Sequence, residues 1–250
     1  MEKTKQKPLL KHLDEFLLVL ENYAPSKQSQ ETLGLIPLVL LVGPTAAGRN
    51  TLINLLAQTG RYHSIVSDTT RAKRSNNGIM EHEGVEYWFK SEAEVLEGLR
   101  NGAYIEAAII HQQQVSGQNI SRIEAAKQAD KIAINEVQID GAANIYRFKP
   151  DTLCIFLLPP SFDTWMQRIR GRGDVDDAEL RRRLISAQDE IKESLEKSYY
   201  QFVVNYEIHE AAQAVDEIAN GRKLDAEKQQ NGRNHAEQLL IDVQLFLAAE

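Results

Sequence analysis

The residues best suited to chemistry lie in one short stretch, Gly43-Pro44-Thr45-Ala46-Ala47-Gly48-Arg49-Asn50-Thr51. Glycines placed in this way let backbone N–H groups face a phosphate, and such a loop usually continues with a Lys that neutralises the phosphate and a Ser or Thr that holds Mg²⁺. Arg49 stands at the Lys position and Asn50 at the hydroxyl position. The stretch predicts a site for nucleotide phosphates in which the two active side chains are exchanged. Asn50 is left as a weak candidate for contact with Mg²⁺ that arrives with the nucleotide.

The elements around this loop favour an anion site. An apolar run at residues 38–42 predicts a buried parallel strand, and residues 49–58 predict a helix. The N-terminus of a helix attracts phosphate through its free N–H groups and its dipole. The alternative is an ordinary strand-to-helix turn, since two glycines alone are a weak signal.

Length and composition limit the class of protein. A chain of 250 residues can bury the core of one large α/β domain with appendages. The formal net charge of −7 disfavours a general binder of nucleic-acid polymers, which would present a broad basic surface. The single cysteine, Cys154, excludes an intrachain disulfide and a cysteine-based metal site. No apolar run approaches the roughly 20 residues that span a bilayer, so we expect a cytoplasmic protein with no membrane partner.

Further strand candidates alternate with helical segments along the chain. They lie at residues 64–67, 131–135, 153–158 and 201–205. Such alternation predicts a parallel sheet with right-handed crossovers. Residues 78–90 interrupt this pattern with short β segments, and residues 162–198 are mainly helical and rich in arginine.

The two ends of the chain carry leucine-rich amphipathic patterns. Residues 8–23 predict a helix followed by a linker at 24–34, and residues 233–249 predict a last helix after a polar stretch that begins near residue 220. An exposed apolar stripe of this size is unfavourable. We therefore expect the two helices to bury their stripes against each other or in a homodimer interface.

Several blocks follow the phosphate loop in the order that is typical of one enzyme family. They are Ser67-Asp68-Thr69-Thr70-Arg71-Ala72-Lys73-Arg74, Gly84-Val85-Glu86-Tyr87-Trp88-Phe89, Gly102-Ala103-Tyr104-Ile105-Glu106-Ala107, Arg168-Ile169-Arg170-Gly171-Arg172-Gly173 and Val203-Val204-Asn205. With the loop, they resemble the guanylate kinase family over about residues 36–219. The number and order of the blocks make the resemblance specific.

The resemblance implies an α/β fold of the P-loop NTPase type over residues 35–219. Its parts would be a parallel sheet flanked by helices, a small β-containing insertion for a nucleoside monophosphate at about 68–117, and a helical lid at about 162–198. It also implies transfer of a phosphoryl group from ATP, with Mg²⁺, to GMP. Arginine-rich motifs suit this chemistry, because phosphoryl transfer depends on positioning and on neutralising charge.

The resemblance also implies a role for individual residues. The catalytic arginines would be Arg49, Arg168, Arg172 and Arg183, and Asn205 would join the loop 43–51 in binding ATP. The acceptor residues would be Ser67, Arg71, Arg74, Tyr87, Glu106, Glu136 and Gln138. Spacing alone leaves plainer alternatives, namely a solvated Arg71/Arg74 pair and a charged helix face for the lid arginines.

The acceptor site departs from the family pattern in places. Alignment puts Val115 where the family has a Tyr that contacts the acceptor, and Ser116 would supply a hydroxyl only if the register shifted. Glu136 keeps the first acid of the family's L-D-x-D-x-Q-G block, whereas Gln138 replaces the second. Glu106 remains able to accept hydrogen bonds from guanine N1 and N2.

Two functions stay open at this point. The retained phosphate ligands favour a kinase that phosphorylates GMP or a related nucleoside monophosphate. The exchanged loop side chains favour a catalytically weak or inactive relative that binds a nucleotide or a protein.

Overall fold

The structure is a computed structural model that describes residues 9–76, 78–171, 175–222 and 225–249. The chain forms two compact units. The first comprises the chain up to Pro37 together with Ile65–Ala133 and Asn144–Pro150. The second comprises Leu38–Ser64, Ile134–Ala143 and the chain from Asp151 onward.

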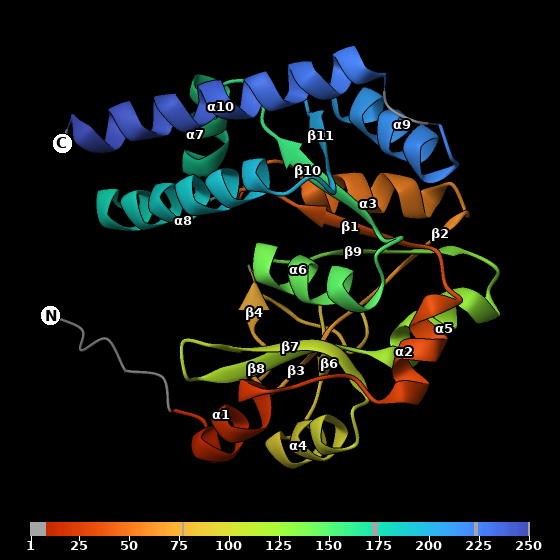
Figure 1. Ribbon diagram of the computed structural model, residues 1–250. Coiled ribbons are helices and arrows are strands. Elements are labelled where there is room, and N and C mark those ends of the chain that lie inside the picture. Colours follow the sequence, from red (N-terminus) through yellow and green to blue (C-terminus); the bar gives the residue numbers. More distant parts are fainter. Residues whose placement is uncertain (1–8, 77, 172–174, 223–224, 250) are drawn as a thin grey trace, which may run out of the picture. The chain divides into compact units, whose positions relative to one another are not determined.

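The second unit is built on a five-stranded sheet with the order β11-β10-β1-β9-β2 (Figure 1). The strands are β1 (Leu38–Val42), β2 (Tyr62–Ser64), β9 (Ile132–Glu136), β10 (Leu153–Leu158) and β11 (Tyr200–Val204). β1 pairs with β10 in parallel, and β10 pairs with β11 in parallel. All five residues of β1 are buried, as expected for a central strand of a parallel sheet. The predicted P-loop NTPase-type α/β fold is confirmed.

One predicted strand lies earlier in the chain than the sequence indicated. The strand expected at residues 64–67 is β2 at Tyr62–Ser64. Tyr62 is the inward residue: its side chain is buried, and its hydroxyl donates to Asp216 Oδ1 at 2.7 Å. This tertiary contact outweighs the β-branched pattern of the next residues.

The helices of the second unit end in a long C-terminal helix. They are α3 (Arg49–Gln58), α7 (Phe162–Arg170), α8 (Asp177–Glu196), α9 (Ile208–Ala219) and α10 (Ala226–Ala248), while α6 (Ile139–Phe148) contributes residues to both units. α10 runs along α8 and also contacts α7 and β11 (Figure 1). Gly232 permits this approach, because a Cβ there would lie 2.7 Å from Phe202 Cβ. The apolar face of α10 is therefore covered by its own unit.

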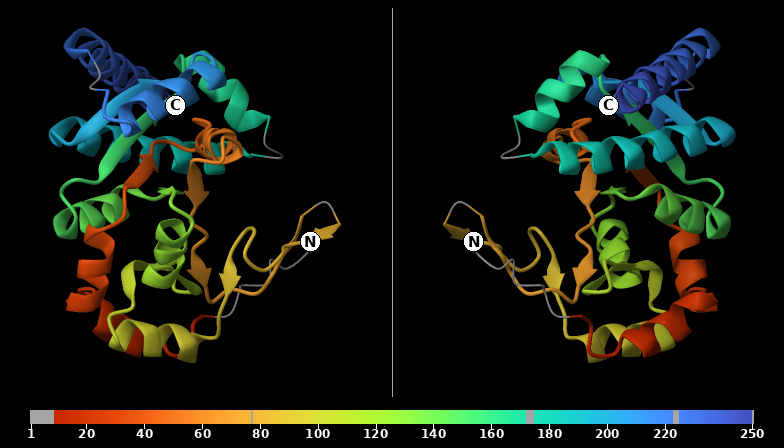
Figure 2. Two further views of the ribbon diagram at one scale, coloured as in Figure 1. Left: turned by 90° about the vertical axis from the view of Figure 1, so that its right-hand side faces the viewer. Right: turned by 90° about the vertical axis from the view of Figure 1, so that its left-hand side faces the viewer.

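The first unit contains a four-stranded sheet with the order β6-β3-β8-β7. Its strands are β3 (Asp68–Thr69), β6 (Trp88–Phe89), β7 (Tyr104–Ile110) and β8 (Gln114–Asn119). A separate hairpin, β4 (Ser75–Asn76) with β5 (Ile79–Met80), projects from this sheet (Figure 2). α4 (Glu92–Arg100) begins at a capping box formed by Ser91 and Glu94, and α5 (Ile120–Gln128) follows β8.

The N-terminal segment folds onto this first unit. α1 (Leu13–Glu21) begins later than expected, because the backbone of residues 10–12 bonds to Gln112 and Glu92 instead of continuing the helix. The stretch expected as a linker contains α2 (Lys27–Gly34), whose first turn is capped by Ser26 Oγ accepting from Ser29 N at 3.1 Å. α1 packs against α4 (Figure 1).

A single apolar cluster explains why α1 needs no cover from the C-terminal helix. Phe16 is completely buried in it, together with side chains from α4, β7 and β8. These are Val95, Leu96, Leu99, Tyr104 and Val115. Each terminal helix therefore buries apolar side chains within its own unit.

Truncation of Phe16 tests this cluster. We expect Phe16→Ala to lower the free energy of unfolding of the first unit by about 3–5 kcal/mol, because a fully buried aromatic side chain leaves a cavity. Leu18→Ala on the same helix is the matched control, since Leu18 is 74% exposed. Urea unfolding of both variants measures the difference, and equal effects would show that α1 is not part of the core.

Candidate active site

The phosphate loop joins β1 to α3 and uses backbone conformations that glycine permits. Gly43 and Gly48 have φ values of 142° and 108°. A Cβ on Gly43 would collide with the Leu157 backbone, and one on Gly48 would lie 2.5 Å from Asn205 Nδ2. Both glycines are therefore required by close packing as well as by backbone conformation.

Two buried side chains hold the loop from the opposite side. Asn205, at the end of β11, donates from Nδ2 to the Ala47 carbonyl at 2.7 Å, and Trp165 of α7 donates from Nε1 to the Thr45 carbonyl at 2.7 Å. Gly48 occupies the N-cap of α3, so no side chain covers the first N–H groups of that helix. The first N–H groups of α3 are therefore left to bind an anion.

The exchanged side chains both contact one carboxylate. Arg49 Nε lies 3.6 Å from Glu136 Oε2, and Arg49 Nη1 donates to the Val137 carbonyl at 3.5 Å. In the amide orientation that satisfies both groups, Asn50 Nδ2 donates to the two Glu136 oxygens at 2.9 and 3.1 Å. Glu136, predicted to bind the acceptor, lies beside the phosphate loop and at the end of β9.

A second acid lies near Arg49. Burial raises the pKa of the Glu190 carboxyl on α8, and the Arg49 guanidinium and the Ser186 hydroxyl oppose that rise. Arg49 is therefore influenced by two carboxylates. Nothing in the sequence singled out Glu190, because α8 carries several acids at similar spacings.

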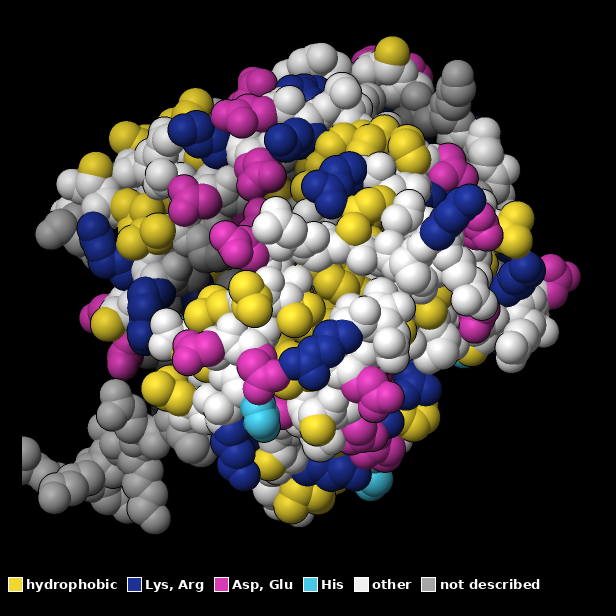
Figure 3. Space-filling view, turned by 60° about the horizontal axis from the view of Figure 1, so that its bottom comes forward, with side chains coloured by type: hydrophobic (Ala, Val, Ile, Leu, Met, Phe, Trp, Pro, Cys, Tyr) yellow, Lys and Arg dark blue, Asp and Glu magenta, His cyan; other side chains and the backbone are white. Residues whose placement is uncertain are grey.

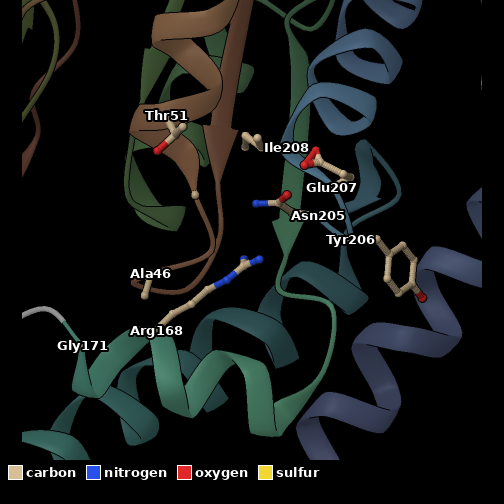
Figure 4. A pocket seen from close by; sticks show the side chains of 9 residues that line it. Ala46, Thr51, Arg168, Gly171, Asn205, Tyr206, Glu207 and Ile208 are labelled. Carbon is tan, nitrogen blue, oxygen red and sulfur yellow. The ribbon is translucent and has the colours of Figure 1, made fainter.

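A cavity of about 440 Å³ opens beside the loop. Its lining residues come from the loop, α3, α7 and the chain after β11, and they are Ala46, Gly48, Thr51, Arg168, Gly171, Asn205, Tyr206, Glu207 and Ile208. Arg168 extends from α7 toward Asn205, whereas the Tyr206 ring points toward α10 (Figure 4). Asn205 Oδ1 is buried and has no hydrogen-bond partner within the described residues. Five residues predicted for the donor site thus meet around one cavity.

Arg183, another predicted lid arginine, forms ion pairs on its own helix. Arg183 Nε donates to Glu179 Oε1 at 2.8 Å, one turn away on α8, and Arg182 pairs with the same carboxylate. Arg183 does not line the cavity. Arg172 lies outside the described residues. For Arg183 the local geometry matches the charged helix face that spacing alone suggested.

In the first unit, Arg71 is held by an acid that the sequence analysis missed. Its terminal nitrogens donate to the two Glu81 oxygens at 2.5 and 2.7 Å, and Arg74 N donates to Glu81 at 2.9 Å. These bonds hold the pKa of Glu81 at about 2. The Arg71 guanidinium also lies 4.8 Å from the centre of the Tyr87 ring. Arg71 is oriented, and a phosphate must compete with Glu81 for its terminal nitrogens.

Glu106 lines a second cavity, of about 280 Å³, that lies within the first unit. Residues 20–24, residues 105–107 of β7 and three residues of α6 surround this cavity. Burial raises the pKa of the Glu106 carboxyl to about 7. Of the described residues predicted for the acceptor, only Glu106 lines this cavity, because Ser67, Arg71, Arg74 and Tyr87 lie elsewhere in the unit.

The strand register decides which residues share a face with Glu106. Glu106 pairs with Gln118, and Ala108 pairs with Ser116, so Ser116 lies on the Glu106 face. Val115 lies on the opposite face, fully buried in the cluster with Phe16. Ser116, whose hydroxyl lies 2.9 Å from Thr69 Oγ1, therefore shares the Glu106 face, whereas Val115, which alignment puts at the position of the family's Tyr, does not.

Other classes of site find no support within the described ranges. No cluster of three or more His, Cys, Asp or Glu side chains in them has the geometry of a metal site. None of their helices combines the length and apolar character needed to cross a bilayer. On the face drawn in Figure 3, acidic and basic side chains are interspersed. Cys154 is buried, and burial raises the pKa of its thiol to about 12.

Comparison with known proteins matches this arrangement to one family. The family model for guanylate kinase matches residues 36–221. A guanylate kinase of Corynebacterium diphtheriae is 35% identical over 189 residues, covering 74% of this chain and 95% of that protein. A guanylate kinase of Corynebacterium glutamicum is 31% identical over 186 residues, covering 74% of this chain and 95% of that protein. The crystal structure of guanylate kinase from Anaplasma phagocytophilum aligns with a TM-score of 0.55 and 25% identity, over 76% of this chain and 87% of that one.

Proposed function

The chain belongs to the guanylate kinase family, and we propose that its second unit binds the donor ATP while its first unit binds the acceptor GMP. It is a nucleoside monophosphate kinase, which transfers the γ-phosphate of ATP to GMP and gives ADP and GDP. The observation that carries the donor assignment is the phosphate loop. Its two glycines are fixed by close packing, its helix is uncapped, and it opens onto a cavity that holds Arg168 and Asn205.

At the donor site, backbone N–H groups of residues 43–51 would bind the ATP phosphates. Arg168 would neutralise charge on the transferring group, since it lines the same cavity as Gly48 and Thr51. The unpartnered Asn205 Oδ1 can accept a hydrogen bond from the adenine 6-amino group. Arg49 would add a permanent positive charge once the phosphates displace Glu136 from it.

The residues beside Arg49 fit a magnesium ion that arrives with ATP. Glu136 offers carboxylate oxygens and Asn50 an amide oxygen, and Mg²⁺ is commonly held by one or two carboxylates together with substrate phosphates. When bound, the ion would offset charge on the β- and γ-phosphates. Glu136 would then exchange its hydrogen bonds with Asn50 for contact with the ion.

At the acceptor site, Glu106 would accept from the N1–H and N2–H₂ groups of guanine. Arg71, Arg74 and Tyr87 would bind the GMP phosphate, with Arg71 oriented by Glu81. Ser67, Gln138 and Arg183 stay predictions that no contact among the described residues supports. Arg172, which lies outside the described residues, also stays a prediction.

A weakly active or inactive nucleotide-binding protein is the second candidate function. The observation in its favour is that Glu136 contacts both Arg49 and Asn50, so the loop's only cation is already neutralised. The rate of phosphoryl transfer separates the two candidates.

Location and assembly are also part of this proposal. A reaction that consumes ATP and GMP fits a cytoplasmic protein. A homodimer through the terminal helices would use exposed apolar side chains such as Leu17 of α1, which is 53% exposed, and Leu245 of α10, which is 66% exposed.

Restoring the usual loop chemistry tests the enzyme assignment. We expect ATP-dependent formation of GDP from GMP, with slower reaction of AMP, UMP and CMP, in an assay coupled to ADP release. The double variant Arg49→Lys with Asn50→Ser should raise kcat by about tenfold or more, because a Lys reaches the phosphates as a point charge and a Ser hydroxyl suits Mg²⁺. Arg222→Lys, at a 71% exposed position, is the control and should change nothing. No GDP from either the wild type or the double variant would favour the second candidate.

The raised pKa of Glu106 predicts how GMP binding depends on pH. Guanine N–H donors require the carboxylate, whereas the carboxyl with a pKa of about 7 is mostly protonated at pH 6 and mostly ionised at pH 8. The affinity for GMP relative to AMP should therefore rise by up to about tenfold from pH 6 to pH 8, since each unit below the pKa lowers the ionised fraction about tenfold. Both nucleotides carry the same phosphate group, so titration of that group affects both affinities equally and cancels in the ratio of the two affinities. In Glu106→Gln the ratio of the GMP and AMP affinities should not change with pH. A ratio that is independent of pH in the wild type would show that Glu106 does not contact the base.

A further inference from the structure

The cavity beside Glu106 is partly built from residues outside the family match. Residues 20–24, which line it, precede residue 36, where the match to the family model begins. They form the end of α1 and the turn that follows it. The N-terminal segment therefore contributes a wall to a cavity that contains the proposed base-reading carboxylate.

This wall is fixed to the strand that carries Glu106. Tyr23 Oη donates to the Tyr104 carbonyl at 2.6 Å and accepts from Tyr104 N at 3.0 Å. One hydroxyl thus satisfies both backbone groups of an edge-strand residue two positions before Glu106. Ser26 N donates to the Gly102 carbonyl at 2.9 Å and continues the attachment along the same segment. These hydrogen bonds fix residues 20–24 to the strand that carries Glu106.

Arg147 supplies the positive charge of the cavity. It lies on α6, with its guanidinium 4.6 Å from the centre of the Phe148 ring, and both residues line the cavity. Arg147 lines a cavity of about 280 Å³ together with two acids, Glu21 and Glu106, and among the described residues no hydrogen bond or ion pair joins it to either.

We propose that Arg147 and residues 20–24 complete the pocket for the acceptor base, an inference that rests on the proposed function. Guanine presents N1–H and N2–H₂ donors on one edge and O6 and N7 acceptors on the next. Glu106 accepts from the donors, and Arg147 donates to O6 and N7 with the planar fork that matches this pair of acceptors. Asn22 and Asn144 line the same cavity with amides that both donate and accept.

Because Glu106 and Arg147 would contact different edges of the base, nucleotides with different bases should be affected differently by replacing each residue. Hypoxanthine keeps O6 and N7 but lacks the 2-amino group, so IMP retains the Arg147 contact and loses part of the Glu106 contact. Adenine carries an amino group in place of O6, so AMP loses the paired acceptors that Arg147 recognises. The two side chains can therefore be tested independently with three nucleotides of equal phosphate charge.

Calorimetric titration of the full chain with GMP, IMP and AMP tests Arg147. We expect Arg147→Ala to lower the affinities for GMP and IMP by about tenfold each, as loss of one bidentate Arg–guanine contact predicts. The affinity for AMP should change by less than about twofold. Arg147→Lys should recover only part of the affinity. Arg222→Ala, which removes a 71% exposed arginine of the second unit, is the control and should leave all three affinities unchanged.

Filling the cavity from the N-terminal side tests the wall. Ala24 lines the cavity and is exposed, so Ala24→Trp should occupy the space of the base and raise the KM for GMP by about tenfold without changing the KM for ATP. Leu18→Trp adds similar bulk on the outward side of α1 and should have no effect on either constant. Thermal melting of both variants shows whether the fold is retained.

Two distinct results would overturn the inference. If the wild type binds GMP but Arg147→Ala and a folded Ala24→Trp bind it equally well, the pocket is elsewhere and the proposed kinase function still stands. If the wild type binds none of the three nucleotides, the acceptor function fails and this pocket fails with it.

Discussion

The carboxylate of Glu136 holds both side chains that stand where a phosphate loop usually has a Lys and a hydroxyl. Asn50 donates to its two oxygens, and Arg49 lies 3.6 Å from one of them. The backbone of the loop does not depend on these contacts, because Asn205, Trp165 and the packing around Gly43 and Gly48 fix it. The shape of an anion site is therefore retained, while its positive charge is shared between Glu136 and any phosphate that binds.

The first unit repeats this physical situation. Arg71, which would bind the acceptor phosphate, is 10% exposed and donates through both terminal nitrogens to Glu81. An arginine held in this way is well oriented, and removing its partner would leave a buried charge unpaired. In both units, a phosphate must compete with a carboxylate for an arginine. The carboxylate orients the arginine side chain but lowers its affinity for phosphate.

The sequence predicted the features that depend on local pattern. Residues 153–158 form β10 as predicted, and the loop residues Ala46, Gly48 and Thr51 meet Arg168 and Asn205 around one cavity. Features that depend on tertiary partners were not predictable. Glu81 and Glu190 are ordinary acids in the sequence and acquire their roles only through folding. Whether Val115 or Ser116 shares a face with Glu106 is set by the pairing of β7 and β8, which a single sequence does not reveal.

Competition between Glu136 and phosphate for Arg49 is tested most directly by measuring ATP affinity without magnesium. Calorimetry of the wild type, Glu136→Gln, Arg49→Ala and the double variant in chelator-containing buffer gives a double-mutant cycle. Glu136→Gln should bind ATP about fivefold more tightly than the wild type, corresponding to an ion pair worth about 1 kcal/mol. This gain should vanish when Arg49 is also replaced. Equal or weaker binding of ATP by Glu136→Gln would contradict the account.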